Sequence, residues 1–510
     1  MDKLNYLAIA ALCSIGLASC SSDYDDEDGT SYYDGYVSNE RASVMDAENM
    51  PFNESGDRFS EIIDNPFIDC SKENTSTFSV DADGASYAIM RKYVTSGYAI
   101  NPSSVRIEEF LNYFTYDYPA PQDDNTVAIS TEIADCPWNS NHKLLRLGIR
   151  GKEISKDEMP KSNYVFLIDV SGSMYPDDKL PLLKQGLTTL ATGLDPEDRI
   201  SIITYSGKVA KLLESTPVKQ IDKINSAIQK LSAEGSTNGG QALIDAYNEA
   251  LANYIQGGNN RVILGTDGDF NVGVTSTDDL LKIVSENADK GIFTTVCGFG
   301  SGNLNDGMME KISNRGNGTY EYIDSEDQMM KVFAHEKSKL ISVACDSKCQ
   351  VTFNPDIVKS FRLIGYENRV MNKEDFADDT KDAGEIGAGQ TITALYEIEL
   401  LPTDAATEPD TEAATAASKI ATFDFRYKKS LGTESIPLSI DINTTDIQAE
   451  PSGEFNFAAG VAAYGMVLRD SEYKGDATLQ LAKSLAQKGL SYDPHGYRAG
   501  FVRLIELNKN

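Results

Sequence analysis

The sequence predicts an α/β fold whose centre is a doubly wound, mostly parallel sheet. Three short apolar runs, at 164–168, 199–204 and 261–266, are rich in the β-branched and aromatic residues that such strands contain. An apolar stripe at the spacing of one helical face lies between the first two runs and consists of Leu183, Leu187, Leu190 and Leu194. Strands that alternate with helices of this kind indicate βαβ units, which form parallel sheets.

The predicted sheet domain spans residues 161–340, and a block of different character lies on each side of it. The N-terminal block, 67–160, has a strand pattern followed by helical patterns at 87–94 and after Asn101, so we expect an α+β region. The C-terminal block, 341–510, begins with alternating strand patterns, so we expect a β-rich domain that ends in helices. The apolar stripe of those helices consists of Phe457, Val461, Tyr464 and Leu468.

The second helix of the N-terminal block has a recognisable start and an aromatic face. Asn101 is a good N-cap residue, and Pro102 is suited to the first helical turn. The residues that follow at the spacing of one face are Ile107, Phe110, Leu111 and Phe114. The aromatic residues allow two interpretations, a sugar-binding surface or a surface that packs against the sheet domain, and packing is favoured.

Oxygen-bearing side chains follow the first predicted strand. Asp169 comes directly after the run at 164–168, and Ser171 and Ser173 follow it around Gly172, which lets the chain turn. The carboxyl ends of strands are where open α/β sheets bind ligands. Carboxylate and hydroxyl oxygens suit Mg²⁺ or Ca²⁺ rather than zinc, so this loop is a candidate metal site.

Two later segments complete the pattern. Thr237 lies in a glycine-rich segment before a helical stretch, and Asp267 directly follows the run at 261–266. The pattern resembles the metal-ion-dependent adhesion site of the von Willebrand factor type A (VWA) domain, a Rossmann-like fold in which D-x-S-x-S is followed by T and then D. The residues that match are Asp169, Ser171, Ser173, Thr237 and Asp267.

The resemblance implies a metal centre that binds a protein partner. In a doubly wound sheet the strands that end in Asp169 and Asp267 lie side by side, so both carboxylates face one crevice. The expected ion is Mg²⁺, and the residues do not distinguish it from Ca²⁺ or Mn²⁺. Two carboxylates roughly balance the charge of the ion, and an exchangeable position can accept a carboxylate from a protein ligand.

The flanking blocks resemble the regions that accompany a VWA domain in a family of bacterial lipoproteins. The resemblance rests on 78–81 and 105–114 in the N-terminal block, and on 360–369, 382–389 and 393–397 in the C-terminal block. With the VWA domain, these blocks cover nearly all of the chain after the leader.

Residues 1–19 are expected to be a lipoprotein signal peptide. Lys3 precedes an apolar stretch at 6–17, which is too short for a permanent membrane span. The sequence Leu-Ala-Ser-Cys that ends at Cys20 resembles the lipobox of bacterial lipoproteins, which implies cleavage before Cys20 and a lipid anchor on it. A general secretory signal with an unrelated cysteine is the alternative.

Residues 20–66 are predicted to be an acidic, flexible tether, because they contain few large apolar residues. The acidic run at 23–28 is similar to the tag that sends Bacteroidetes lipoproteins to the outer leaflet of the outer membrane. We therefore expect a lipid-anchored protein of the outer membrane that is displayed on the cell surface. A periplasm-facing protein on a plain tether is the alternative.

Composition and motifs exclude several other functions. A net charge of −32 argues against nucleic-acid binding, which needs a basic surface. The three histidines (His142, His335 and His495) are widely spaced without a zinc pattern, and no G-x-S-x-G motif occurs. We predict no catalytic residues and no enzyme activity. Metal-dependent protein binding is the leading function, and a scaffold for complex assembly without an adhesion role is the alternative.

The cysteines give little further information. Cys345 and Cys349 lie in an alternating strand pattern, where four residues span roughly 13 Å, so a disulfide between them is not expected. Whether Cys70 and Cys136 pair is left open.

Overall fold

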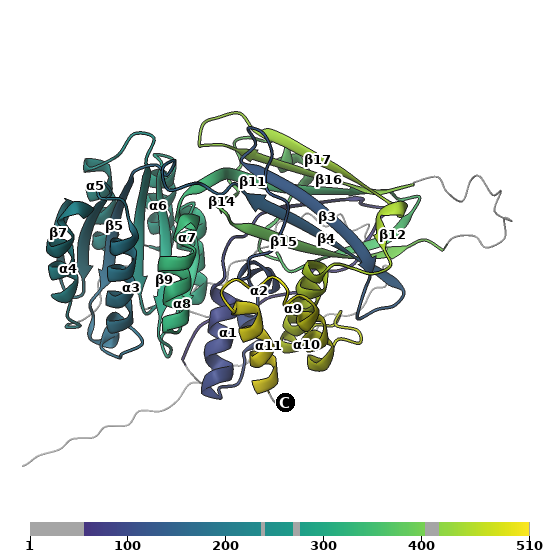
Figure 1. The fold of residues 1–510 in the computed structure, drawn as a ribbon, viewed down its shortest axis with the longest axis horizontal. Coiled ribbons are helices and arrows are strands. Elements are labelled where there is room, and N and C mark those ends of the chain that lie inside the picture. Colours follow the sequence, from purple (N-terminus) through teal and green to yellow (C-terminus); the bar gives the residue numbers. More distant parts are fainter. Residues whose placement is uncertain (1–55, 236–239, 269–275, 403–417, 509–510) are drawn as a thin grey trace, which may run out of the picture. The chain divides into compact units, whose positions relative to one another are not determined.

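The computed structural model describes residues 56–235, 240–268, 276–402 and 418–508, all of which belong to one compact unit of the chain. Figure 1 shows their helices and strands in sequence colours. Within these ranges, none of the helices is both long and apolar enough to cross a bilayer.

The middle of the sequence forms a six-stranded sheet with the order β10-β9-β8-β5-β6-β7 (Figure 1). Its strands are β5 (Ser162–Asp169), β6 (Arg199–Tyr205), β7 (Val209–Pro217), β8 (Asn259–Thr266), β9 (Ile292–Phe299) and β10 (Tyr320–Ile323). All neighbours are parallel except β7, which runs antiparallel to β6 at one edge. The prediction of a doubly wound, mostly parallel sheet is confirmed.

Helices cover both faces of this sheet. Along β5 the side chains alternate, so that Val165 and Leu167 contribute to one core and Tyr164 and Phe166 to the other. The first face is covered by α5 (Gly240–Ala252), α6 (Thr277–Ala288) and α7 (Asp306–Arg315). The second is covered by α3 (Leu180–Gly193), α4 (Ile221–Gln229), α8 (Glu326–Met330) and the π-helical turn Lys331–His335. Burial on both faces explains why the strands are continuous apolar runs.

Two further sheets pack face to face around a core that includes Phe78, Val351, Leu145 and Phe361. One sheet has the order β1-β12-β15-β4-β3-β18, and the other has the order β13-β2-β11-β16-β17, with β14 paired to β11. The strands from the N-terminal part are β1 (Ile68–Asp69), β2 (Thr75–Ser79), β3 (Val127–Asp135) and β4 (His142–Gly151). Those from the C-terminal part are β11 (Ser342–Phe353), β12 (Val358–Ile364), β13 (Val370–Met371), β14 (Gly384–Gly387), β15 (Thr391–Leu400), β16 (Lys419–Lys428), β17 (Ile436–Asn443) and β18 (Ile447–Gln448).

The two flanking blocks share both of these sheets. In β2, Phe78 pairs with Cys349 of β11, and Thr77 pairs with Gln350. In the other sheet β4 lies between β3 and β15. The C-terminal part is β-rich and ends in helices, as predicted, but its strands complete sheets that the N-terminal part begins.

Five helices, α1 (Ala85–Ser96), α2 (Ile107–Asn112), α9 (Gly453–Arg469), α10 (Leu479–Lys488) and α11 (Tyr497–Leu507), form a separate layer. Asn101 accepts a hydrogen bond from the amide of Ser103, but it caps only the 3₁₀ turn Pro102–Ser104, and α2 starts later than predicted. The other 3₁₀ turns among the described residues are Gly172–Met174, Val218–Gln220, Lys337–Leu340, Lys373–Phe376 and Thr444–Asp446.

The aromatic face after Asn101 packs differently from the prediction. The ring of Phe114 lies 4.9 Å from that of Phe457 on α9 and 5.5 Å from that of Phe501 on α11. Phe110 is buried in the same cluster. The aromatic face therefore packs against the C-terminal helices and not against the six-stranded, mostly parallel sheet, and its burial excludes a sugar-binding surface there. α1 contacts that sheet instead, through Ala88 and Ile89.

The predicted tether is too long at its C-terminal end. Asp57 is fully buried, and its carboxylate accepts hydrogen bonds from the amides of Gly302 and Leu304 at 2.8 and 3.0 Å. Phe59 is also buried and packs edge-on against Tyr93 of α1. The prediction is wrong for this stretch, because its few large or charged side chains find partners far away in the sequence. Residues 20–55 lie outside the described residues.

Cys345 and Cys349 are both on β11 and both free, as the strand pattern predicts. Cys70 and Cys136 are also free, and both are buried.

Candidate metal centre

The loop after β5 gathers the first three predicted metal ligands. Asp169 is fully buried, and its carboxylate accepts hydrogen bonds from the amide of Ser171 at 2.8 Å and the hydroxyl of Thr266 at 3.3 Å. The 3₁₀ turn Gly172–Met174 brings the hydroxyl oxygen of Ser173 to 3.0 Å from that of Ser171. Burial raises the pKa of Asp169 to about 6, although the amide and hydroxyl of Ser171 act in the opposite direction.

Asp267 lies at the same edge of the sheet because β5 and β8 pair in parallel. Leu167 is opposite Leu264, and Ile168 is opposite Gly265, so the residues that follow the two strands are neighbours. Asp267 is fully buried, and its Oδ1 atom has no hydrogen-bond partner among the described residues. A buried carboxylate oxygen without a partner loses its hydration without compensation, and a bound cation would remove that cost.

A lysine that the sequence analysis missed also belongs to this site. The Nζ atom of Lys179 lies 2.9 Å from Oδ2 of Asp267 and 3.5 Å from the side-chain oxygen of Asn303, and only 6% of the lysine is exposed. Burial acts to raise the pKa of Asp267, but the hydroxyl of Ser173 and the ammonium of Lys179 outweigh it and hold this pKa below its usual value. The local sequence gave no signal, because a lysine after two aspartates in a loop is typical of an exposed position.

Two of the predicted functional residues, Thr237 and Cys20, lie outside the described residues. The described residues just before Thr237 are hydrogen-bonded to the loop that follows β5. The amide of Gly172 donates to the carbonyl of Gly235 at 3.1 Å, and the amide of Glu234 donates to the carbonyl of Val170 at 2.6 Å. The structure therefore brings Asp169, Ser171, Ser173 and Asp267 together.

One side of the site is open to solvent. Gly172 and Ser173 are exposed, whereas Asp169 and Ser171 are buried. Tyr175 follows on the same loop, and 78% of it is exposed. A binding partner can therefore approach the hydroxyl side of the site and meet an aromatic ring beside it.

The donor set fits a hard divalent cation. Two carboxylates and two hydroxyls are oxygen donors only, as Mg²⁺, Ca²⁺ and Mn²⁺ require. The orphaned oxygen of Asp267 is the observation that favours an ion here. The described part of the chain contains no group of three or more His, Cys, Asp or Glu side chains placed to bind a metal. The candidate site combines two carboxylates with serine hydroxyls, so it does not belong to the class of sites built from three or more His, Cys, Asp or Glu side chains.

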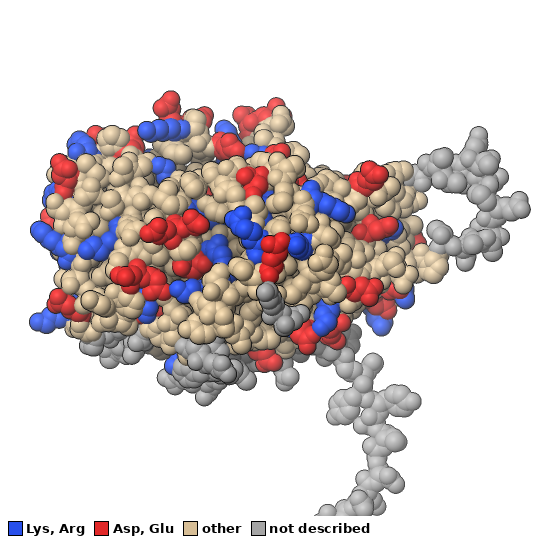
Figure 2. All heavy atoms as spheres, turned by 60° about the horizontal axis from the view of Figure 1, so that its bottom comes forward, with Lys and Arg blue, Asp and Glu red and all other residues tan. Residues whose placement is uncertain are grey.

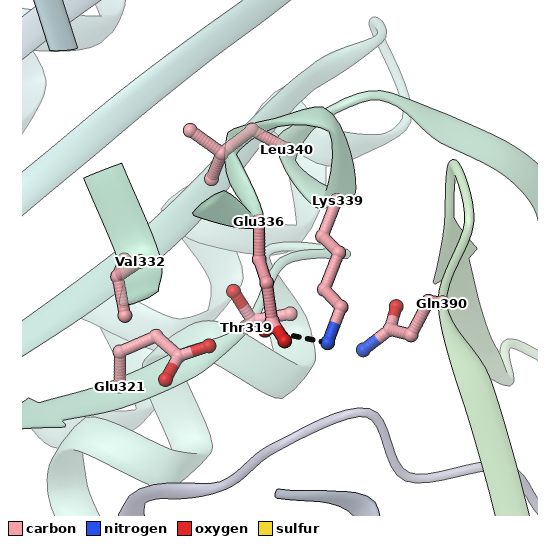
Figure 3. Close-up of a pocket in the computed structure, with 7 residues that line it drawn as sticks. All are labelled: Thr319, Glu321, Val332, Glu336, Lys339, Leu340 and Gln390. Atoms are coloured by element: carbon pink, nitrogen blue, oxygen red, sulfur yellow. Dashed lines mark hydrogen bonds and ion pairs between the residues drawn. The ribbon is translucent and has the colours of Figure 1, made fainter. Parts of the chain in front are cut away.

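A separate polar pocket is lined in part by Glu321 of β10 (Figure 3). Glu336 forms ion pairs there with Lys331 and with Lys339, the latter at 2.6 Å. Burial raises the pKa of Glu321 to about 7 and lowers that of Lys331 to about 8. The residues that line the pocket are Thr319, Glu321, Val332, Glu336, Lys339, Leu340 and Gln390.

Surface charge is mixed on the face of the molecule that Figure 2 shows. Lysine and arginine side chains are interspersed with aspartate and glutamate and do not merge into a continuous basic area. This distribution and the net charge of −32 both disfavour a nucleic-acid partner on that face.

Three family models match the chain in succession. Residues 53–146 match the model described as von Willebrand factor, and residues 163–335 match the von Willebrand factor type A domain. Residues 338–510 match the model described as uncharacterized protein YfbK, C-terminal.

Individual proteins show the same similarity. Protein YfbK of Escherichia coli strain K12 is 40% identical over 470 residues, which span 88% of this chain and 80% of that protein. Human inter-alpha-trypsin inhibitor heavy chain H2 is 28% identical over 197 residues, or 36% of this chain and 20% of that protein. Among solved structures, a von Willebrand factor type A protein from Catenulispora acidiphila gives a TM-score of 0.43 at 15% identity, covering 76% of this chain and 91% of that one.

Proposed function

Since the chain belongs to the protein family of Escherichia coli YfbK and contains a von Willebrand factor type A domain, we propose that it binds a protein partner through a divalent metal ion. VWA domains commonly bind protein partners, and many hold a divalent ion at this edge of the sheet. In the proposed complex a carboxylate of the partner completes the coordination of the ion. Mg²⁺ is the proposed ion, with Ca²⁺ and Mn²⁺ as alternatives.

The observation that carries this proposal is the pair of buried carboxylates at the ends of two adjacent strands. Asp169 and Asp267 are both fully buried, and one oxygen of Asp267 has no partner among the described residues. Burying two acids side by side is costly unless a cation compensates them. Lys179 supplies one positive charge, which leaves one carboxylate charge uncompensated.

Each residue of the site has a distinct role in the proposal. Asp169 and Asp267 supply negative charge, and Ser171, Ser173 and Thr237 supply hydroxyl oxygens. The bound ion would supply a position that attracts an anionic oxygen of the partner. The hydrogen bonds from Ser171 and Thr266 to Asp169 fix the orientation of its carboxylate before binding.

Tyr175 is the proposed contact of the partner beside the metal. It is the most exposed large apolar side chain among the described residues, and it lies two residues after Ser173. Exposed tyrosines with a rigid, amphipathic ring are frequent hot spots of protein interfaces. The partner is therefore proposed to place an apolar or cationic group next to its carboxylate.

We propose no catalytic activity for this site. The hydroxyls of Ser171 and Ser173 lie against each other, and His142 pairs with Glu397 in a different sheet. The other two histidines stack on each other with ring centroids 4.4 Å apart. Purified protein that hydrolysed esters or phosphoesters in a Mg²⁺-dependent way would contradict this part of the proposal.

A pull-down from envelope extracts tests the function directly. Wild-type protein should retain a partner in Mg²⁺ and release it in EDTA, and Asp169→Asn should retain none. Asp222→Asn, an exposed aspartate at the start of α4, is the matched control and should behave like the wild type. Equal retention by wild type and Asp169→Asn, with or without EDTA, would contradict metal-dependent binding.

We also propose that the protein is a lipoprotein anchored at Cys20 in the outer membrane. Cys20→Ser should abolish fatty-acid labelling and release the protein from the membrane, and unchanged labelling would contradict the anchor. Protease treatment of whole cells should remove a surface protein. A protected protein would instead support the alternative of a periplasm-facing scaffold without an adhesion role.

A further inference from the structure

Lys179 is held at the metal centre by a position that only glycine can provide. Gly300 has a φ of +69°, and a Cβ atom built there would lie 2.1 Å from Cε of Lys179. The stem of the lysine therefore lies directly on the backbone of the loop after β9. Its ammonium is fixed against Asp267 and Asn303 rather than free to reach solvent.

Lys179 therefore changes the net charge of the side chains around the predicted ion from the value that the two aspartates alone would give. Asp169 and Asp267 alone would neutralise a divalent ion. With the buried ammonium of Lys179 included, the ion and these three side chains together carry one net positive charge. Because the three side chains are buried, water and salt screen that charge weakly.

We propose that Lys179 is a built-in counter-charge that weakens the site for the ion alone and makes the loaded site select an anionic partner group. This inference rests on the proposed function and deepens it. The ammonium repels the ion, so the ion binds less tightly than two aspartates would allow. The same repulsion is relieved when a carboxylate arrives, so ion and partner carboxylate bind cooperatively. Lys179 acts through Asp267 and is a positioning residue.

The test replaces the charge and keeps the stem. Met is unbranched and similar in length, so Lys179→Met retains the packing on Gly300 and removes the ammonium. In EDTA, Lys179→Met should melt at a lower temperature than the wild type, because Asp267 has lost its partner. In calorimetric titrations of the full chain, the Mg²⁺ affinity of Lys179→Met should nevertheless be at least about tenfold higher than that of the wild type.

These opposite signs separate the proposal from a purely structural role. A lysine that only supports the fold would lower both the melting temperature and the Mg²⁺ affinity when replaced. Lys223→Met, an exposed lysine on α4, is the matched control and should change neither quantity. If Lys179→Met does not fold in EDTA, Lys179→Gln gives the same comparison, because its neutral amide removes the charge and leaves a hydrogen-bond donor for Asp267.

A separate measurement tests whether the ion-loaded site selects an anionic group, with acetate as the probe. Acetate should change the water-proton relaxation of the Mn²⁺-loaded wild type at a concentration about tenfold lower than for Lys179→Met. Equal or weaker Mg²⁺ binding by both neutral variants, or equal acetate midpoints, would overturn the inference. If the wild type itself binds neither Mg²⁺, Ca²⁺ nor Mn²⁺, the proposed function fails as well, so the two failures are distinguishable.

Discussion

Replacing Arg106 should destabilise the protein strongly, because this arginine joins the N-terminal part of the chain to the VWA domain through buried ion pairs. Its guanidinium contacts both carboxylate oxygens of Asp306 at 2.5 and 3.0 Å, pairs with Glu109 and lies 3.7 Å from Glu310. Arg106→Met would leave these acids without their cation. Removing one partner of a buried ion pair costs about 3–5 kcal/mol, so the free energy of unfolding should fall by that amount at neutral pH.

The pH dependence of this loss follows from the acids that remain. Burial raises the pKa of Glu109 to about 8 even though Arg106 acts to lower it, so the stability of the wild type should already fall as pH rises from 5 to 8. Without the arginine, the pKa of Glu109 should rise further, because the folded variant holds this proton more tightly. The stability of the variant should therefore fall more steeply than that of the wild type over this range.

Urea denaturation at pH 5 and pH 8 measures both effects from the midpoint and slope of the transition. Arg503→Met, an exposed arginine on α11, is the control and should change the free energy of unfolding by less than about 0.5 kcal/mol. A loss below about 1 kcal/mol for Arg106→Met, or a loss that is the same at both pH values, would refute the reasoning.

Three other substitutions have defined outcomes. Burial raises the pKa of Glu321 to about 7, so the stability that its protonated form contributes is lost as pH rises from about 4.5 to 7. Glu321→Gln should remove this pH dependence of the free energy of unfolding in urea titrations, and an unchanged pH profile would contradict the prediction. Gly318→Ala would place a Cβ atom 2.0 Å from the carbonyl oxygen of Thr294 and should cost about 2–3 kcal/mol in thermal melts, whereas a neutral result would mean that the backbone yields freely. Tyr175→Ala should weaken partner retention at least about tenfold and leave Mg²⁺ affinity unchanged in calorimetry, and a loss of Mg²⁺ binding would assign Tyr175 to the metal instead.

The central sheet could be predicted because its signals are local. Each strand is a short apolar run, and an acid directly after a strand must lie at the carboxyl edge of a parallel sheet. This logic placed Asp169 and Asp267 together, and the parallel pairing of β5 with β8 puts them there. Which ion binds is not a local property of the sequence, and stays a prediction with the role of Thr237.

Features set by distant contacts could not be predicted. The strand at Thr75–Ser79 was visible, but its pairing with β11 joins residues about 270 positions apart, such as Phe78 and Cys349. The aromatic face that includes Phe114 was also visible, and periodicity does not say which surface covers it. Lys179 is a further case, because its burial depends on a glycine in the loop after β9.

The measurement that tests the metal centre most directly is a thermal melt with and without Mg²⁺. Because an ion that binds only the folded state stabilises it by RT ln(1 + [ion]/Kd), wild-type protein should gain about 2.7 kcal/mol at one hundred times Kd. Asp169→Asn should fold and show coincident melts in Mg²⁺ and EDTA. If Mg²⁺, Ca²⁺ and Mn²⁺ all leave the melting temperature of the wild type unchanged, and calorimetry detects no heat of binding, the metal-dependent account is contradicted.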